Sequence, residues 1–278
     1  MSRRLSCFAR CCAVALLVGS LCSLARPAPQ NVPAQTAQVL ARARQRYYNL
    51  RREGLIEFQS NIEPNWKVVL GDAQKSEALK LLSALHFSMS VDPDSKLRMD
   101  HRSDLNPTNQ RSAEAFEQIF RQMDEAVSRF FITWSIFMLT SPFPENGTYE
   151  VEEKAGEFHF AQNQPGSRTL MITDRNLMIT EMTVYGEGFT ATLRPDFENT
   201  SSGYVLTGYT GTYQTLSGAR NTHLKVWLDY QQIQGMRLPR KVNLETVFEG
   251  KAAQLEWLFT DYKVRRTESR AQMREHIR

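Results

Sequence analysis

Residues 241–262, KVNLETVFEGKAAQLEWLFTDY, contain two strand-like runs separated by a short polar turn. The runs cover residues 241–248 and 253–262, and residues 249–251 (EGK) between them are a hairpin signal. No helix can fit between the two runs, so the strands pair antiparallel. This hairpin predicts that the C-terminal part of the chain folds as an antiparallel meander.

The same pattern continues upstream as far as Thr148. Each apolar run there ends at a glycine or at a cluster of polar turn residues, and no helical segment intervenes. Several of these runs are apolar on both faces, as in residues 177–185, which indicates a sheet covered on both sides or curled around an interior. The further strands are predicted at residues 149–152, 157–160, 169–173, 177–185, 188–193, 204–213 and 223–232.

The N-terminal half is richer in helix signals. Helices are predicted at residues 35–52, 73–85 and 112–139, where Ser112 is the N-cap of the third helix and Pro142 bars its continuation. A strand at residues 55–62 and a hairpin at 86–91 and 96–102 separate them. Helices followed by a meander predict one α+β domain over residues 35–265.

The third helix ends in an unusually apolar block, residues 129–139, RFFITWSIFML. At about 100° per residue, one apolar stripe runs the length of the helix, whereas Ile132, Ile136 and Leu139 form an opposite stripe in its last two turns. An end that is apolar all round must be covered on both sides. Three explanations stay open: a position between a sheet and another helix, contact with a hydrophobic ligand across a cavity, or contact with a membrane surface. The long stripe contains Phe116, Ile119, Phe120, Met123, Val127, Phe130, Phe131, Trp134 and Met138.

Residues 1–25 have the layout of a secretory signal peptide. Two arginines precede an apolar run that is shorter than the ~20 residues of a membrane span, and residues 23–25 (SLA) form a cleavage site. The alternatives are an uncleaved anchor and a lipoprotein signal acylated at Cys22, for which Leu21 is a poor match. All four cysteines lie in this segment, so the mature chain would contain no disulfide and no thiolate metal site.

Cleavage after Ala25 leaves a Pro-rich linker at residues 26–34 and lowers the formal net charge from +4 to +1, because three arginines are lost. A nearly neutral protein gives no reason to expect nucleic acid as a partner. The remaining basic bias lies in the tail, residues 266–278, which is typical of a solvated end.

Signatures of catalysis are absent from the sequence. It contains no H-E-x-x-H, G-x-S-x-G, G-x-G-x-x-G or P-loop motif, and none of its five histidines shares a helical turn with another. We therefore expect no enzymatic activity, no cofactor and no metal. A hydrolase with an unrecognised site is the weakest alternative.

The C-terminal segment resembles the periplasmic outer-membrane lipoprotein-sorting (LolA/LolB-like) family. The resemblance is carried by residues 230–242, YQQIQGMRLPRKV, by residues 259–262, FTDY, and by the early helix with residues 47–50, YYNL, leading into the first strand. Residues 64–147 depart from that family. The resemblance implies a curved, incompletely closed antiparallel sheet, a half-barrel, with helices covering its concave face.

The resemblance also implies an exported, periplasmic, monomeric carrier for a lipid or a lipoprotein acyl chain, with membrane proteins of the envelope as further partners. Each methylene shielded from water contributes about 0.8 kcal/mol, so such binding needs no catalytic group. The alternative is a structural or interaction protein of the envelope with the same fold and no cavity. The predicted ligand-lining residues are Phe130, Phe131, Trp134, Phe137, Trp227 and Trp257.

Overall fold

The computed structural model describes residues 34–71, 76–106, 110–145, 147–216, 221–248 and 250–267. The predicted leader, the linker as far as residue 33 and the basic tail from residue 268 lie outside these ranges. The described chain forms one antiparallel sheet in the order β3-β2-β1-β12-β11-β10-β9-β8-β7-β6-β5-β4, which is not closed into a barrel. Its strands are β1 Leu55–Pro64, β2 Leu85–Val91, β3 Leu97–Ser103, β4 Glu150–Lys154, β5 Glu157–Gln164, β6 Ser167–Thr173, β7 Ile179–Gly186, β8 Phe189–Thr200, β9 Gly203–Thr215, β10 Asn221–Ile233, β11 Met236–Phe248 and β12 Lys251–Arg266.

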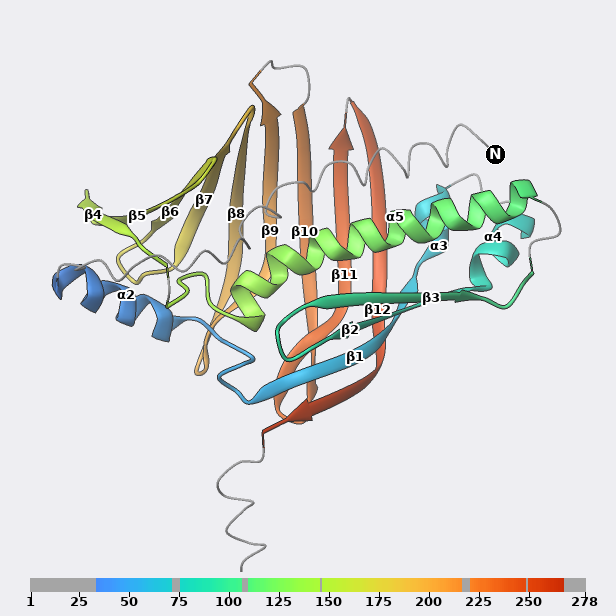
Figure 1. The fold of residues 1–278 in the computed structure, drawn as a ribbon, viewed down its shortest axis with the longest axis horizontal. Coiled ribbons are helices and arrows are strands. Elements are labelled where there is room, and N and C mark those ends of the chain that lie inside the picture. Colours follow the sequence, from blue (N-terminus) through green and yellow to red (C-terminus); the bar gives the residue numbers. More distant parts are fainter. Residues whose placement is uncertain are drawn as a thin grey trace, which may run out of the picture.

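One long helix, α5 (Gln110–Trp134), lies across a face of the sheet (Figure 1). The rings of Phe130 and Trp257 in β12 approach to 6.1 Å, and those of Phe120 and Phe87 in β2 to 5.7 Å. The sheet therefore curves around α5 and contacts it from two sides. The shorter helices are α2 (Ala34–Arg46), α3 (Trp66–Leu70) and α4 (Ser76–Ser83).

The α+β class, the meander and every predicted strand are confirmed. The first helix ends at Arg46 rather than at residue 52, because Tyr47 leaves the helix to form a bridge with Tyr204. The second helix is described only from Ser76 to Ser83. The short helix α3 was not predicted from the sequence.

The sheet bends where extra residues interrupt its ladders. Thr207 in β9 and Arg240 in β11 have no partner in the register, and β12 carries an irregularity at Asp261, whose φ is 52°. A bulge increases the local twist and bends its strand. These interruptions lie on β9, β11 and β12, in the middle of the sheet, where a bend lets the two ends of the sheet reach both sides of α5.

Arg51 fastens the start of β1 to the turn between β2 and β3. Its half-buried guanidinium donates to the carbonyl oxygens of Leu55 (3.1 Å) and Asp92 (2.7 Å) and to Ser95 Oγ (2.9 Å). Burial lowers the pKa of Arg51, although the group stays charged. The link is therefore a charge-assisted one between two distant segments.

We expect Arg51→Met to destabilise the protein by about 2–4 kcal/mol, because several buried carbonyl groups lose their donor at once. Urea unfolding would measure this loss. Arg98→Met, at an exposed position of the edge strand β3, is the control and should change stability by less than about 0.5 kcal/mol. Equal effects of the two substitutions would contradict the proposed role of Arg51.

Candidate functional site

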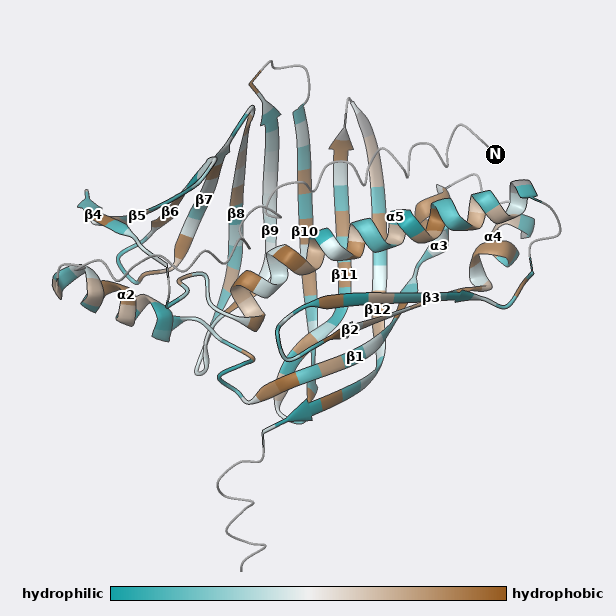
Figure 2. Ribbon diagram, viewed as in Figure 1, coloured by the Kyte–Doolittle hydropathy of each residue, from teal (hydrophilic) through white to brown (hydrophobic). Residues whose placement is uncertain are grey.

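The candidate site is the interior between α5 and the sheet. The long apolar stripe of α5 faces this interior, and of its members only Phe116 is more than slightly exposed. Figure 2 shows that hydrophobic residues dominate the C-terminal part of the helix. The prediction that this stripe faces the core is therefore confirmed.

The apolar block does not end as a regular helix. Residues Ser135–Leu139 form a π-helical turn, and Phe137, Met138 and Leu139 are all completely buried. The wider turn rotates these residues relative to α5, so three consecutive side chains can point into protein.

The chain segment after α2 crosses and caps this end of the helix. Leu50 N donates to Met138 O (2.9 Å), and Arg51 N donates to Leu139 O (3.3 Å). The last carbonyl groups of a helix have no partner within it, and here another segment supplies the donors. This segment covers one side of the apolar block.

The second stripe meets another part of the same sheet. Ile132 and Ile136 are half-buried and pack against Val184 of β7 and Ala191 of β8, in a small cluster completed by Phe189 and Tyr213. The two apolar sides of the block thus contact two regions of one curved sheet. Of the three explanations left open by the sequence, the first required another helix as the cover; among the described residues the curved sheet provides the cover on this side instead.

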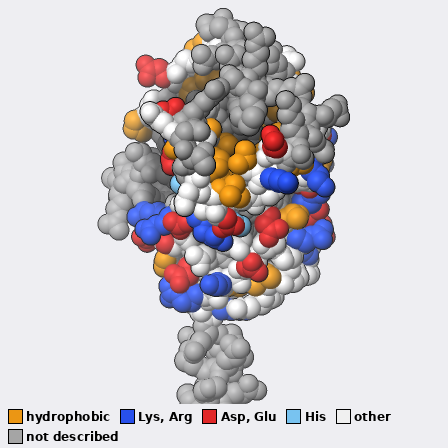
Figure 3. All heavy atoms as spheres, turned by 90° about the vertical axis from the view of Figure 1, so that its right-hand side faces the viewer, with side chains coloured by type: hydrophobic (Ala, Val, Ile, Leu, Met, Phe, Trp, Pro, Cys, Tyr) orange, Lys and Arg blue, Asp and Glu red, His pale blue; other side chains and the backbone are white. Residues whose placement is uncertain are grey.

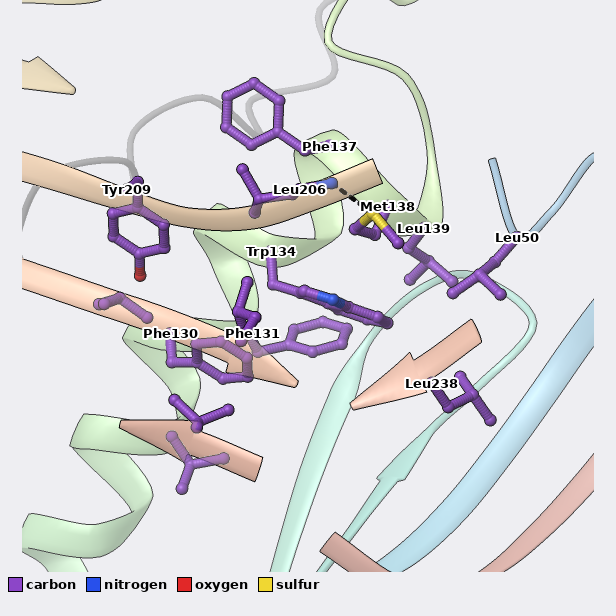
Figure 4. Packing of buried hydrophobic residues seen from close by; sticks show 14 of the residues in the cluster. Leu50, Phe130, Phe131, Trp134, Phe137, Met138, Leu139, Leu206, Tyr209 and Leu238 are labelled. Carbon is purple, nitrogen blue, oxygen red and sulfur yellow. Dashed lines mark hydrogen bonds between the residues drawn. The ribbon is translucent and has the colours of Figure 1, made fainter. Parts of the chain in front are cut away.

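Five of the six predicted ligand-lining residues lie together in this interior. Phe131 and Trp134 have ring centroids 5.8 Å apart, and Phe130 lies 6.1 Å from Trp257. Phe137 contacts Phe197 at 5.7 Å, further along the same core. Figure 4 shows the side chains of Phe130, Phe131 and Trp134 beside one another, with Leu206 and Tyr209 near them. Their exposed fractions are 4% or less, so protein side chains surround all five.

Trp227 does not belong to this group. Its neighbours Val226 and Leu228 are buried on the inner face, whereas Trp227 is half-buried on the opposite face with Lys225 Nζ 4.5 Å from the ring centroid. It is paired with Gly208, and an aromatic ring beside a strand glycine shields backbone that has no side chain. The position of Trp227 does not fit the prediction that it lines the interior.

Tyrosine hydroxyls line the edge of the interior where the bulges interrupt the ladders. Tyr230 donates to Leu206 O (2.6 Å), next to bulge residue Thr207, and Tyr262 donates to Pro239 O (2.8 Å), next to bulge residue Arg240. Desolvation raises the pKa of both tyrosines, so both remain donors. The nearby indole N–H of Trp134 is buried without a well-aligned acceptor.

No charged side chain is buried in the described part of the chain. The buried polar residues there are Ser60, Gln122 and six threonines. Histidines occur at the periphery, where His86 pairs with Asp104 at 2.6 Å and His101 stacks on Phe120 at 4.0 Å. The interior is therefore apolar and contains no charged residue of the described chain, and most of its few polar groups are hydroxyl groups.

Among the described residues, no three His, Cys, Asp or Glu side chains lie close enough to one another to hold a metal ion. None of the helices described is long and apolar enough to cross a membrane. The expectation that the chain is not an enzyme stays a prediction.

Sequence reasoning missed several residues of the interior. Phe58 of β1 has its ring 6.2 Å from Trp134 and 5.9 Å from Tyr262, and the alternating pattern of residues 55–62 already pointed to its burial. Tyr230 and Tyr262 were noticed only for the family resemblance. Every methionine in the described ranges belongs to the core or packs against it, namely Met89, Met99, Met123, Met138, Met171, Met178, Met182 and Met236.

The chain matches no protein-family model, and comparisons with curated proteins and with solved structures gave no significant match. The functional assignment therefore depends on the geometry of this interior and on physical argument.

Proposed function

We propose that the protein is a non-enzymatic, exported carrier that binds an acyl chain or lipid between α5 and the curved sheet. The observation that carries this proposal is a large core beneath one long helix, in which aliphatic, aromatic and methionine side chains are buried and no charged residue of the described chain is. Methionine side chains are flexible and repack around different ligands. The half-barrel of the lipoprotein-sorting family is the architecture that the proposal assumes.

Binding would require α5 to move away from the sheet. Trp134, Phe137 and Trp257 are almost completely buried, so an acyl chain must replace contacts that the helix makes. About ten buried methylenes would contribute about 8 kcal/mol, which can offset the cost of this displacement. The π-turn Ser135–Leu139, which Leu50 and Arg51 hold through two backbone hydrogen bonds, would then stay in place as the fixed end about which α5 turns.

Tryptophan quenching by a brominated fatty acid tests the proposal. The chain has four tryptophans, of which Trp134 and Trp257 lie in the interior and Trp227 lies on the outer face. We expect saturable quenching that unlabelled fatty acid reverses. Trp134→Phe and Trp257→Phe should each remove part of the quenched signal.

Trp227→Phe is the matched control, since it removes an outer-face fluorophore and should leave the quenched signal intact. Quenching confined to Trp227, or no saturable quenching, would overturn the proposal. Mass spectrometry of organic extracts from the purified protein would identify the lipid that the protein carries.

The near-complete burial of the five interior candidates favours a second function, an envelope interaction protein whose core is permanently filled. On that assignment α5 never leaves the sheet, and partners bind only the surface. The quenching experiment separates the two, because a permanently filled core gives no saturable quenching of Trp134 or Trp257.

A further inference from the structure

The C-terminal end of α5 is fixed to the rest of the protein through backbone groups. Leu50 N and Arg51 N donate to the carbonyl oxygens of Met138 and Leu139. On the other side Leu206 N of β9 donates to Met138 Sδ (3.4 Å; Figure 4). Met138 and Leu139 are also completely buried. This end of the helix therefore cannot leave the sheet without breaking hydrogen bonds to two other segments.

Side-chain contacts hold the N-terminal half of α5 on the sheet. The ring of Phe120 lies 5.7 Å from Phe87 of β2 and stacks on His101 of β3 at 4.0 Å. Phe116, one turn earlier, is only half-buried. Figure 3 looks onto this end of the molecule, where hydrophobic side chains reach the surface among charged groups of both signs. The apolar stripe is thus less completely covered here than at the π-turn.

His101 also meets Asp124, one turn further along α5. Its Nδ1 lies 3.9 Å from Asp124 Oδ2, and the two side chains are 34% and 36% exposed. The other carboxylate oxygen, Asp124 Oδ1, is buried and has no hydrogen-bond partner among the described residues. From β2, the residue paired with His101 is the apolar Phe87. A buried acceptor without a donor is costly, and more so when it is charged, so an ionised Asp124 disfavours the closed position of the helix.

Three other charged residues lie close to this pair. Asp100, next to His101 in β3, acts on the Asp124 carboxyl. On α5 itself, Arg121 and Glu125 are the nearest charged residues along the chain, and both are exposed. Water screens exposed charges, so His101 and Asp100 dominate the electrostatics of Asp124.

Acid favours the closed position of α5. Burial raises the pKa of the Asp124 carboxyl above its ordinary value, His101 opposes the rise and Asp100 adds to it. The carboxyl therefore binds a proton more readily while the helix lies on the sheet than after the helix lifts and water reaches it. A proton on His101 acts in the same direction, because it places a cation 3.9 Å from Asp124 Oδ2. As the pH rises, both protons leave and the contact weakens.

We infer that α5 opens from its N-terminal half, and that His101 and Asp124 latch this half to β3 more firmly in acid than at neutral pH. The inference rests on the proposed function for its purpose, because a carrier needs a lid that opens. Release of the latch would expose the part of the interior beneath Phe120, while the π-turn stays in place.

Thiol labelling of single cysteines tests which end of α5 opens. The chain from Arg26 onward contains no cysteine, so Met123→Cys and Leu139→Cys each introduce one thiol at a completely buried position. The labelling rate of each variant in urea, divided by its rate in buffer at the same pH, gives a protection factor that is free of the pH dependence of the thiol. At neutral pH we expect Leu139→Cys to be protected at least about tenfold more strongly than Met123→Cys.

Lowering the pH from about 7.5 to about 5, where histidine side chains ordinarily gain a proton, should raise the protection of Met123→Cys at least about threefold. Asp124→Asn removes the buried charge, and His101→Phe keeps an aromatic ring in the stack but cannot take up a proton. Each should remove most of this rise. His86→Phe is the matched control, because His86 also lies 2.6 Å from an aspartate but on the opposite face of β2, and it should leave the rise intact.

Equal protection of the two thiols would overturn the inference, because unfolding of the whole domain would then expose both. Protection of Met123→Cys that does not change with pH would overturn it as well. So would a rise that survives both latch substitutions, or one that His86→Phe removes equally. The labelling needs no fatty acid, so failure of the latch leaves the quenching test of the proposed function intact. A working latch without quenching would show a helix that moves in a protein that carries no lipid.

Discussion

Raising the pH from about 9 to about 11 should remove most of the stability of the protein, because tyrosine hydroxyls that are held away from water must stay protonated in the folded state. Tyr47, Tyr209, Tyr230 and Tyr262 all have raised pKa values, and desolvation is the largest cause for each. Tyr47 also donates to Leu177 O (2.9 Å) and accepts from Ile179 N (2.7 Å), which only the protonated phenol can do together.

The sign of this pH dependence follows from the direction of the pKa shift of the tyrosines. A tyrosine whose folded pKa lies above its unfolded pKa of about 10 contributes its full stability below pH 10 and loses it as the pH rises further. For each such tyrosine, the free energy of unfolding falls by about 1.4 kcal/mol for each pH unit above 10. Four of them remove about 6 kcal/mol by pH 11, which is comparable to the whole stability of many domains.

Urea unfolding at a series of alkaline pH values, together with tyrosinate absorbance, measures this loss. Tyr230→Phe and Tyr262→Phe should each remove about 1.4 kcal/mol of the loss between pH 10 and pH 11, although each lowers stability at neutral pH by losing its bond to a carbonyl group next to a bulge. A stability that stays constant up to about pH 11 would show that these hydroxyls ionise freely in the folded protein.

The strands could be predicted from sequence because each depends on local pattern. Residues 241–262 contain two strand-like runs and the turn between them within one short segment. In the structure β11 ends before that turn and β12 begins after it. The bulges could not be predicted in the same way. Thr207 and Arg240 are ordinary strand residues by type. They lack a pairing partner only because of the register between their strands and the adjacent ones.

The interior was predictable in part for a similar reason. Helical spacing placed Phe130, Phe131 and Trp134 on one stripe, which is a local property of α5. Phe137 became buried through the π-turn, and its contact with Phe197 joins residues far apart in the sequence. Trp227 was assigned by residue type alone. Its face follows from the alternation with Val226 and Leu228, a signal that the sequence already contained.

Trp134→Ala should lower the free energy of unfolding by about 3–5 kcal/mol, the usual cost of removing a large aromatic side chain from a packed core. Trp134 is 1% exposed and contacts Phe58 and Phe131 from two different elements. Its removal leaves a gap that no neighbour fills without moving α5. Urea unfolding with an unchanged m-value would measure the loss.

The same variant distinguishes a carrier from a permanently filled protein. An apolar gap between α5 and the sheet binds apolar molecules, and a ligand that binds only the folded state raises its stability. In a carrier, fatty acid should stabilise both the parent and Trp134→Ala, and the variant by more, because its helix is easier to displace. In a permanently filled protein, fatty acid should stabilise the variant alone. Trp227→Ala, on the outer face, should respond to fatty acid as the parent does, and a larger response from it would place the ligand outside the interior.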